Sequence, residues 1–363
     1  MNHEPANDPS SLQLEFKMHA MRPILYIIAS LMLAPPVLAQ EIRDVPVRQL
    51  PLPQAASPEL RALIQTGSMA TWNDHPATAD DWKSWIAQGA EKASAVLPAL
   101  REKMGVTVEA SKIAGVNVFT IVPKDVSPEN RDRVLIHFHG GGYVLNPGEA
   151  GTGEAIMMAG LGHVRVISVD YRMPPDFPYP AAMDDAFAVY KGVLATNDAS
   201  RIGVFGTSTG GAMTLALVLR AKAEGLPLPG AIAAGTPWAD LEKIGDSYFS
   251  NDSVDNVLVR YEGWLGDAAK LYAGGHYMKD PYLSPIYGDY RGFPPTILVT
   301  GTRDLFLSNT VRVHRKLRES GAVADLVVFE GLSHAQYLFS PDMHEAKEYF
   351  RELEGFFNAH LKR

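Results

Sequence analysis

The stretch GTSTG, residues 206–210, follows a short apolar segment at 202–205 and precedes an Ala/Leu-rich segment at 210–223. The first segment predicts a strand and the second a helix, which places Ser208 on the sharp turn between them. Glycines two residues away on each side let strand and helix approach closely, because glycine has no Cβ atom. The pattern predicts a serine nucleophile, with a Ser/Thr/Gly-rich surface loop as the alternative.

A second motif, HGGGY at residues 139–143, directly follows another apolar segment at 134–138. Its three consecutive glycines leave backbone N–H groups without side-chain cover. Acyl transfer needs such donors, because negative charge develops on the carbonyl oxygen and fixed N–H dipoles stabilise it. The motif therefore predicts an oxyanion hole. A flexible hinge is the alternative, but it does not explain the accompanying strand and serine turn.

A nucleophilic serine also needs a base and a group that orients the base, and both are expected downstream, the acid before the histidine. Asp304 follows a predicted strand at 296–300, and His334 follows another at 325–329. We predict that His334 accepts the Ser208 proton and returns it to the leaving group, while Asp304 fixes the tautomer of His334. The alternatives are a helix cap for Asp304 and a packing or surface role for His334.

Beyond residue 122, short apolar runs alternate with helical stretches, which predicts a mostly parallel α/β sheet covered by helices on both faces. The predicted strands are 134–138, 164–169, 202–205, 231–234, 296–300 and 325–329, after two earlier ones at 106–109 and 116–122, and the predicted helices include 181–194, 310–320 and 342–360. Active groups in such sheets gather at the carboxyl ends of the strands. Gly141, Ser208, Asp304 and His334 all fall at such ends.

The N-terminal residues predict a separate segment. An apolar run at 24–33 follows Arg22 and leads to small residues before Ala39, a pattern that resembles an export signal cut after Ala39. We therefore expect residues 1–39 to be a signal peptide with upstream residues, and the protein to be exported, either periplasmic or secreted. The alternative is an uncleaved segment that anchors the protein to a membrane.

Residues 40–105 are expected to precede the sheet as a separate helical block. Prolines indicate an extended lead-in to about residue 56, and Ser57 followed by Pro58 predicts the start of a helix. The pattern from 59 to 104 is mostly helical, with one apolar face formed by Trp82, Ile86, Ala93, Val96 and Leu97. Two readings remain open for the tryptophans Trp72, Trp82 and Trp85: they line an apolar pocket, or they pack a helical core.

Residues 240–290 lack the strand–helix alternation and carry many aromatic side chains. We expect an excursion that covers the site as a lid. A peripheral packing insertion or an oligomer contact, such as that of a homodimer, fits the sequence equally well.

Composition limits the classes of partner. The net charge is −8 and no Lys/Arg stripe is visible, which argues against nucleic acid and favours a small molecule. The chain has no cysteine, so disulfides and thiolate chemistry are excluded. The pair His137 and His139 lacks the further ligands expected of a metal site, and we expect neither a metal nor an organic cofactor.

Several separated motifs, taken in order, resemble those of the hormone-sensitive lipase-like family of α/β-hydrolase carboxylesterases. They are HGGGY at 139–143, Asp170-Tyr171-Arg172 with Pro174 and Pro175, Pro180-Ala181-Ala182 with Asp184 and Asp185, and GTSTGG at 206–211. The resemblance implies an α/β-hydrolase catalytic domain at 106–363 and a helical cap built from residues 40–105.

The resemblance also implies roles for single residues. By its place in the motifs, Ser208 is similar to the family's nucleophile, Asp304 to its acid and His334 to its base. The oxyanion hole is implied to consist of the backbone N–H groups of Gly141, Gly142 and Thr209. It implies that Gly140 serves the turn and that His139 is structural. Members usually carry Ala after the nucleophile, so the branched Thr209 is expected to narrow the pocket.

We therefore predict a serine carboxylesterase that forms an acyl-enzyme at Ser208 and hydrolyses small to medium uncharged esters. Two alternatives use the same triad, an amidase or peptidase and a lactone hydrolase. A third is a catalytically silent hydrolase-like protein that binds ligand without turnover.

Overall fold

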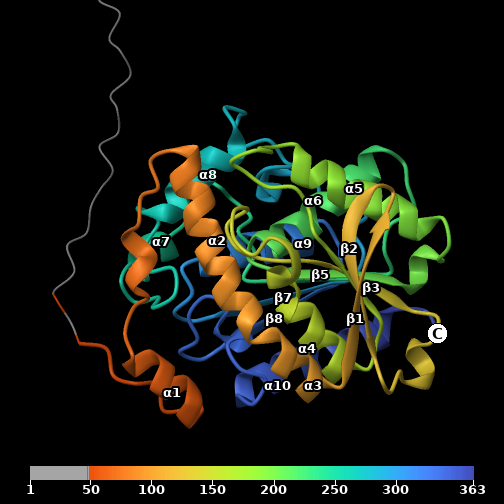
Figure 1. Ribbon diagram of the computed structural model, residues 1–363, viewed down its shortest axis with the longest axis horizontal. Helices are drawn as coiled ribbons and strands as arrows, with labels where there is room; N and C mark the ends of the chain where they lie inside the picture. The colour runs from red at the N-terminus through yellow and green to blue at the C-terminus, as the bar shows by residue number, and fades with distance from the viewer. Residues whose placement is uncertain (1–46, 48) are drawn as a thin grey trace, which may run out of the picture. The chain divides into compact units, whose positions relative to one another are not determined.

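An eight-stranded sheet with the strand order β1-β2-β4-β3-β5-β6-β7-β8 forms the centre of the computed structural model (Figure 1). The structure describes residue 47 and residues 49–363, and the unit from 51 to 363 is considered below. The strands are β1 (Val106–Ile113), β2 (Val116–Pro123), β3 (Val134–Phe138), β4 (Val166–Val169), β5 (Ile202–Thr207), β6 (Ala231–Gly235), β7 (Thr296–Gly301) and β8 (Ala324–Phe329). β2 pairs antiparallel with β1 and β4, and every other pairing is parallel.

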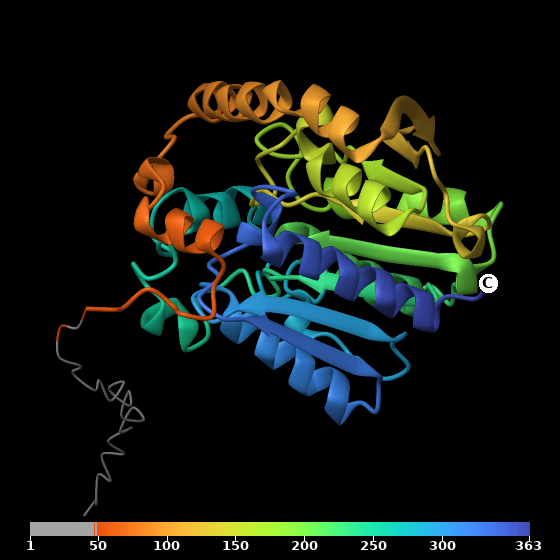
Figure 2. The same cartoon turned by 90° about the horizontal axis from the view of Figure 1, so that it is seen from below.

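Helices cover both faces of the sheet (Figure 2). They are α1 (Pro58–Gln65), α2 (Ala79–Ala95), α3 (Leu97–Met104), α4 (Gly153–Gly162), α5 (Ala181–Leu194), α6 (Thr209–Ala223), α7 (Ser247–Ser250), α8 (Trp264–Ala273), α9 (Leu307–Glu319) and α10 (His344–His360). Side chains of α5, α6 and α9 share one core with Ile136 of β3, whereas α4 and α10 share a second core with its neighbour Leu135. Successive strand residues point to opposite faces, so the sheet separates the two cores.

The structure confirms the predicted strands. Apolar runs predicted them well because buried parallel strands carry apolar side chains on both faces. All five residues of β3 are buried, and its observed bounds match the prediction. β4 begins at Val166 rather than at 164, and α9 begins at Leu307 rather than at 310. No helix was predicted for α4, which contains three glycines and therefore has low intrinsic helix propensity.

The N-terminal helices follow the predicted block with one correction. Ser57 caps α1 by accepting a hydrogen bond from the N–H of Leu60, with Pro58 as the first helical residue, as predicted. Trp82 is buried, but Val96 is 62% exposed and does not belong to the buried face. α2 ends before Val96 because Pro98 supplies no N–H to continue the helix, and the chain restarts there as α3.

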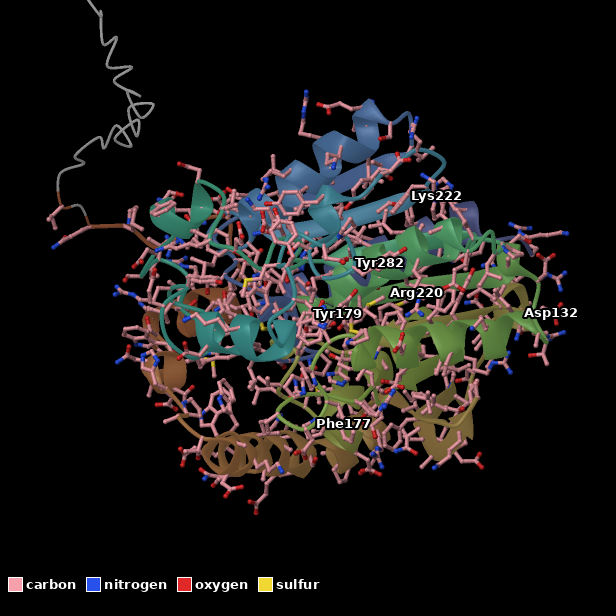
Figure 3. The ribbon with its side chains drawn as sticks, turned by 90° about the horizontal axis from the view of Figure 1, so that it is seen from above. Asp132, Phe177, Tyr179, Arg220, Lys222 and Tyr282 are labelled. Carbon is pink, nitrogen blue, oxygen red and sulfur yellow. The ribbon has the colours of Figure 1, made fainter. Side chains whose placement is uncertain are left out.

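The outer side of α5 and α6 is polar. Arg220 of α6 is labelled in Figure 3. It lies over the ring of Phe187, 4.5 Å from its centre, and forms an ion pair of 2.7 Å with Asp184. The Asp184 side chain is half exposed, so solvent screens this pair and it adds little to stability.

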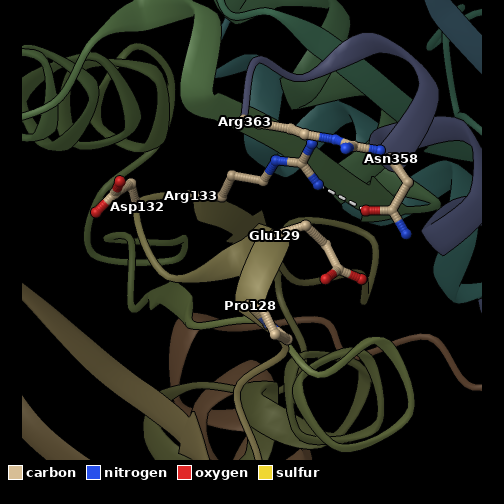
Figure 4. A pocket seen from close by; sticks show the side chains of 6 residues that line it. All are labelled: Pro128, Glu129, Asp132, Arg133, Asn358 and Arg363. Carbon is tan, nitrogen blue, oxygen red and sulfur yellow. Dashed lines mark hydrogen bonds between the residues drawn. The ribbon is translucent and has the colours of Figure 1, made fainter.

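One buried cation ties the residues after α10 to the start of β3. The guanidinium of Arg133 donates to the carbonyl oxygens of Leu361 (2.7 Å) and Lys362 (3.1 Å). It also donates to the side-chain oxygens of Asn130 (3.0 Å) and Asn358 (2.6 Å), the latter bond being visible in Figure 4. A buried charge is tolerated only when its hydrogen bonds are largely satisfied, and these four bonds use four of the five N–H donors of Arg133.

Candidate active site

Four loops meet at the carboxyl ends of β3, β5, β7 and β8. They carry the glycine motif at 139–143, Ser208, Asp304 and His334, respectively. The positions named from the sequence are thus placed at one edge of the sheet, as expected for a parallel α/β sheet.

Ser208 occupies a strained turn between β5 and α6. Its φ of +64° and ψ of −121° lie in a region that side-chain-bearing residues rarely adopt. Two backbone hydrogen bonds hold this conformation, from the Ser208 N–H to the Gly235 carbonyl (2.8 Å) and from the Trp238 N–H to the Ser208 carbonyl (3.0 Å). A Cβ at Gly210 would collide with the backbone carbonyl of Phe138, so only glycine fits there. The turn places the Ser208 hydroxyl at the wall of a cavity.

A buried polar network lies behind this turn. The hydroxyl of Thr207 donates to the carboxylate of Glu154 (2.7 Å) and contacts the hydroxyl of Tyr337 (3.1 Å). Glu154 also accepts from the hydroxyl of Tyr349 (3.0 Å) and lies 3.1 Å from Nε2 of His137. These groups fix the residue that precedes the serine. Glu154 was not predicted as a site residue, and only its place in an otherwise apolar stretch could have indicated it.

Asp304 and His334 are hydrogen-bonded to each other. Nδ1 of His334 lies 3.0 Å from Oδ1 of Asp304, and both residues are buried. The same Asp304 carboxylate accepts from the Thr300 hydroxyl (2.7 Å) and from the N–H of Phe306 (2.9 Å). A carboxylate at Nδ1 selects the tautomer that leaves Nε2 free to accept a proton.

Ser208 and His334 border the same cavity, although no hydrogen bond joins their side chains in the part of the chain that the structure describes. Serine–histidine contacts in unliganded hydrolases are often long and shorten when substrate binds. The arrangement is therefore compatible with proton transfer between the two residues.

The glycine loop exposes backbone donors at the same cavity. Gly141 and Gly142 have φ values of +126° and +65°, and a Cβ on Gly142 would lie 2.6 Å from the ring of Trp264. Among the loop and turn hydrogen bonds of residues 51–363, none uses the N–H of Gly141 or Gly142. Thr209 is the first residue of α6, whose N–H has no partner inside the helix. Gly141 and Gly142 therefore line the cavity with backbone N–H groups that have no partner among these bonds, and the N–H of Thr209 directly follows the Ser208 turn.

His139 is held neutral next to this loop. Its ring stacks on Tyr171 with 4.2 Å between ring centres, and its Nδ1 lies 2.9 Å from the Gly140 carbonyl. Burial lowers the pKa of His139 to about 4, so the imidazole carries no charge near neutral pH. Within the described residues, no group of three His, Cys, Asp or Glu side chains is placed to hold a metal ion.

The cavity has a volume of about 750 Å³ and mostly apolar walls. α2 and α3 contribute Trp85, Leu97 and Leu100, and the 240–290 excursion contributes Leu258 and Trp264. Apolar walls with a few convergent polar groups are typical of small-molecule sites. Both the N-terminal helices and the excursion therefore shape the pocket.

The structure corrects the expectation for Thr209 and decides the role of each tryptophan. The side chain of Thr209 is fully buried and does not line the cavity, so it does not narrow the pocket as expected. Of the tryptophans, Trp85 lines the cavity and Trp82 packs in the core. Trp72 stacks under the guanidinium of Arg260, 4.9 Å from the ring centre.

Comparisons with known proteins agree with this architecture. A profile of the α/β-hydrolase fold family matches residues 135–338. An acetyl-hydrolase of Streptomyces hygroscopicus is 26% identical over 64% of this chain and 77% of its own length. An esterase of Acinetobacter venetianus is 29% identical over 62% of this chain and 74% of its own length.

Solved structures extend the likeness over most of the chain. The crystal structure of esterase E25 has a TM-score of 0.86 and 45% identity, covering 88% of this chain and 99% of that chain. An esterase from the bacterial hormone-sensitive lipase family has a TM-score of 0.74 and 28% identity, covering 85% of this chain and all of that chain.

The fold and its loops at the strand ends define an α/β-hydrolase that acts on carboxylic esters. The chain belongs to the hormone-sensitive lipase-like family of carboxylesterases, as its motifs implied. Its substrate is a small-molecule ester.

The predicted localisation is wrong. Nothing in the compared proteins supports export. The apolar run at 24–33 and the expected cut after Ala39 lie outside the residues that the structure describes. Within residues 49–363, no helix has the length and apolar character needed to cross a membrane.

Proposed function

We propose that Ser208, His334 and Asp304 form the catalytic triad of this carboxylesterase. His334 takes the proton of the Ser208 hydroxyl as its oxygen attacks the ester carbonyl, and it then returns that proton to the leaving alcohol. Water, deprotonated by the same imidazole, hydrolyses the acyl-enzyme. Asp304 holds the tautomer and stabilises the imidazolium. The bond of 3.0 Å between Asp304 and His334, at the cavity that Ser208 borders, carries the proposal.

We propose that the N–H groups of Gly141, Gly142 and Thr209 form the oxyanion hole. All three come from backbone at the rim of the site, and the left-handed turn at 141–142 keeps two of them out of the surrounding hydrogen bonds. Fixed donors of this kind stabilise the tetrahedral intermediate without reorganisation.

The walls of the cavity favour small to medium uncharged esters. Apolar side chains from α2, α3 and the excursion dominate the lining, and a volume of about 750 Å³ accommodates a molecule of modest size. We propose that 40–105, the predicted lead-in and helical block, supplies the cap of this site and that 106–363 forms the catalytic domain. Steady-state rates on esters and amides with the same acyl group check the preference for esters.

Covalent labelling tests the triad directly. A fluorophosphonate should attach to Ser208, located by mass spectrometry of the peptides, and Ser208→Ala should lose labelling and about 10⁶-fold in turnover. Ser84→Ala, at an exposed position of α2, serves as the control and should keep both. Labelling at another serine, or a loss of only about tenfold in Ser208→Ala, would contradict the assignment.

The homodimer considered from the sequence stays a prediction. Sedimentation equilibrium at several protein concentrations gives the mass in solution and decides between monomer and dimer.

A further inference from the structure

Asp255 is a fully buried carboxylate beside the proposed triad, and it belongs to neither the triad nor the oxyanion hole. It lies in the 240–290 excursion, between α7 and α8, and therefore comes from a different part of the chain than Asp304 or His334. Asp255 was not predicted as a site residue, because one aspartate in an irregular segment has no distinctive pattern.

Both carboxylate oxygens of Asp255 accept backbone hydrogen bonds. Oδ1 accepts from the N–H groups of Val257 (2.8 Å) and Leu258 (3.1 Å), which closes a turn within the excursion. Oδ2 accepts from the N–H of Leu305 (2.8 Å) and from the N–H of His334 (3.3 Å). One carboxylate oxygen thus links the residue after the proposed acid to the proposed base.

The neighbouring residue strengthens the same junction. The N–H of Asn256 donates to the hydroxyl of Ser333 (3.2 Å), and that hydroxyl donates to the side-chain oxygen of Asn256 (2.7 Å). The side-chain amide of Gln336 donates to the same oxygen (3.0 Å). The loop that carries His334 is therefore attached to the excursion on both sides of the histidine.

The charge of Asp255 also acts on the imidazole. Two titratable groups face its carboxylate, Asp304 from the loop after β7 and His334 from the loop after β8. Burial and the Asp304 carboxylate raise the pKa of Asp255 to about 6, against the opposing effect of His334 and of the backbone donors. Asp255 is therefore ionised at neutral pH, and its negative charge attracts the positive charge that develops on the His334 ring during proton transfer.

We propose that Asp255 is a positioning residue for ester hydrolysis, which fixes the Asp304 and His334 loops to one another and stabilises the charge that develops on His334. The inference rests on the proposed triad. It gives the excursion a part in the chemistry as well as in shaping the cavity.

The test compares Asp255→Asn with Asp252→Asn. Asn keeps the shape of Asp255 but removes the charge and turns one acceptor into a donor that faces two N–H groups. Asp252 lies in the same segment, pairs with Arg260 at 3.0 Å and is partly exposed, so its variant removes an equal charge away from the triad. The measurements are kcat, KM and the pH profile of kcat/KM on one ester, each normalised to the folded fraction by circular dichroism.

We expect Asp255→Asn to lower kcat by about tenfold or more while KM changes by less than about twofold, because alignment and transition-state charge are affected more than binding. The acidic limb of kcat/KM should move to lower pH by about half a unit, because protonation of His334 loses a favourable neighbour. Asp255→Glu keeps the charge and should return the acidic limb towards its wild-type position. Asp252→Asn should match the wild type in all three quantities.

Three results would overturn the inference. The first is a kcat for Asp255→Asn within about twofold of the wild type. The second is an unshifted acidic limb, and the third is failure of both the Asn and Glu variants to fold, since each would reduce Asp255 to a structural role. Failure of the triad is separable: it would appear as retained activity in His334→Ala or Ser208→Ala, whatever Asp255→Asn does.

Discussion

Gly142 shows how strictly the backbone of the glycine loop is specified. Its φ is +65°, and the space where a Cβ would lie is taken by the Trp264 ring of the excursion. A side chain at this position would therefore strain the backbone and push the loop away from the wall of the cavity.

We expect Gly142→Ala to lower kcat by about 10² to 10³, because displaced N–H donors no longer meet the oxyanion. The control is Gly148→Ala, since Gly148 has nearly the same φ (+64°) but open space where the Cβ would lie. Initial rates on a p-nitrophenyl ester measure both variants. An equal loss of activity in both variants would show that backbone strain, and not the contact with Trp264, causes the loss. Wild-type activity in Gly142→Ala would contradict the prediction.

Thr207 permits a second test at this scale. Thr207→Val removes the hydroxyl that bonds Glu154 and Tyr337, and it leaves a buried carboxylate with one partner fewer. We expect the free energy of unfolding to fall by about 1–3 kcal/mol, measured by urea denaturation. Thr214→Val is the control, because the buried Thr214 hydroxyl donates only to the Gly210 carbonyl within α6 (2.9 Å). A loss in Thr207→Val no greater than in Thr214→Val would contradict the role of the network.

At the scale of elements, α1 is fastened to α10 through its first cap. The N–H and hydroxyl of Ser57 donate to the two carboxylate oxygens of Glu345, at 2.8 and 2.7 Å, while the hydroxyl accepts from Leu60. The Ser57 side chain thus caps α1 and also joins α1 to α10, through a partner 288 residues away in the sequence.

We expect Ser57→Ala to lower the free energy of unfolding by about 1–2 kcal/mol, because the cap and one charge-assisted bond are lost together. Urea denaturation measures the change, with Ser68→Ala at an exposed position after α1 as the control. An unchanged urea midpoint in Ser57→Ala would show that the backbone bond to Glu345 is sufficient.

The elements predicted from the sequence are those with a strong local pattern. β3 and α5 have the predicted bounds, because an unbroken apolar run and a regular helical period leave little choice. α4 could not be predicted, since its glycine-rich sequence is helical only through burial against α3 and α10. The contacts of the excursion were also beyond prediction, because they depend on pairing with distant loops.

At the scale of the whole molecule, two buried groups give stability opposite dependences on pH. Burial lowers the pKa of His139 to about 4, so acidification below about 6.5 protonates the unfolded chain first and destabilises the fold. Burial raises the pKa of Asp255 to about 6, so the folded chain takes up this proton first and gains stability between about 6 and 4. The two effects partly cancel in the wild type.

Removing Asp255 and removing His139 should therefore change the pH dependence of the free energy of unfolding in opposite directions. Between pH 6.5 and 4, stability should fall more steeply than in the wild type for Asp255→Asn and less steeply for His139→Gln, by up to about 1.4 kcal/mol per pH unit. Urea midpoints at several pH values measure both slopes. Changes of the same sign in the two variants would contradict this account.

Within the candidate site, only the residues proposed for the triad and for the oxyanion hole could be named from the sequence. Ser208, Asp304 and His334 were named because strand ends and motifs place them, and the structure brings them to one edge of the sheet. Glu154 and Asp255 were not named, because each acts through hydrogen bonds to residues far away in the sequence. Supporting groups of this kind have no fixed spacing from the residues they support.

The tie between Arg133 and the residues after α10 sets an order on folding during synthesis. Arg133 leaves the ribosome long before Leu361 and Lys362, which follow it by 228 and 229 residues. Until those carbonyl groups are translated, the guanidinium has no acceptors there, and burying it would be costly. The nascent chain therefore completes the packing around Arg133, at the start of β3, only after α10 has emerged.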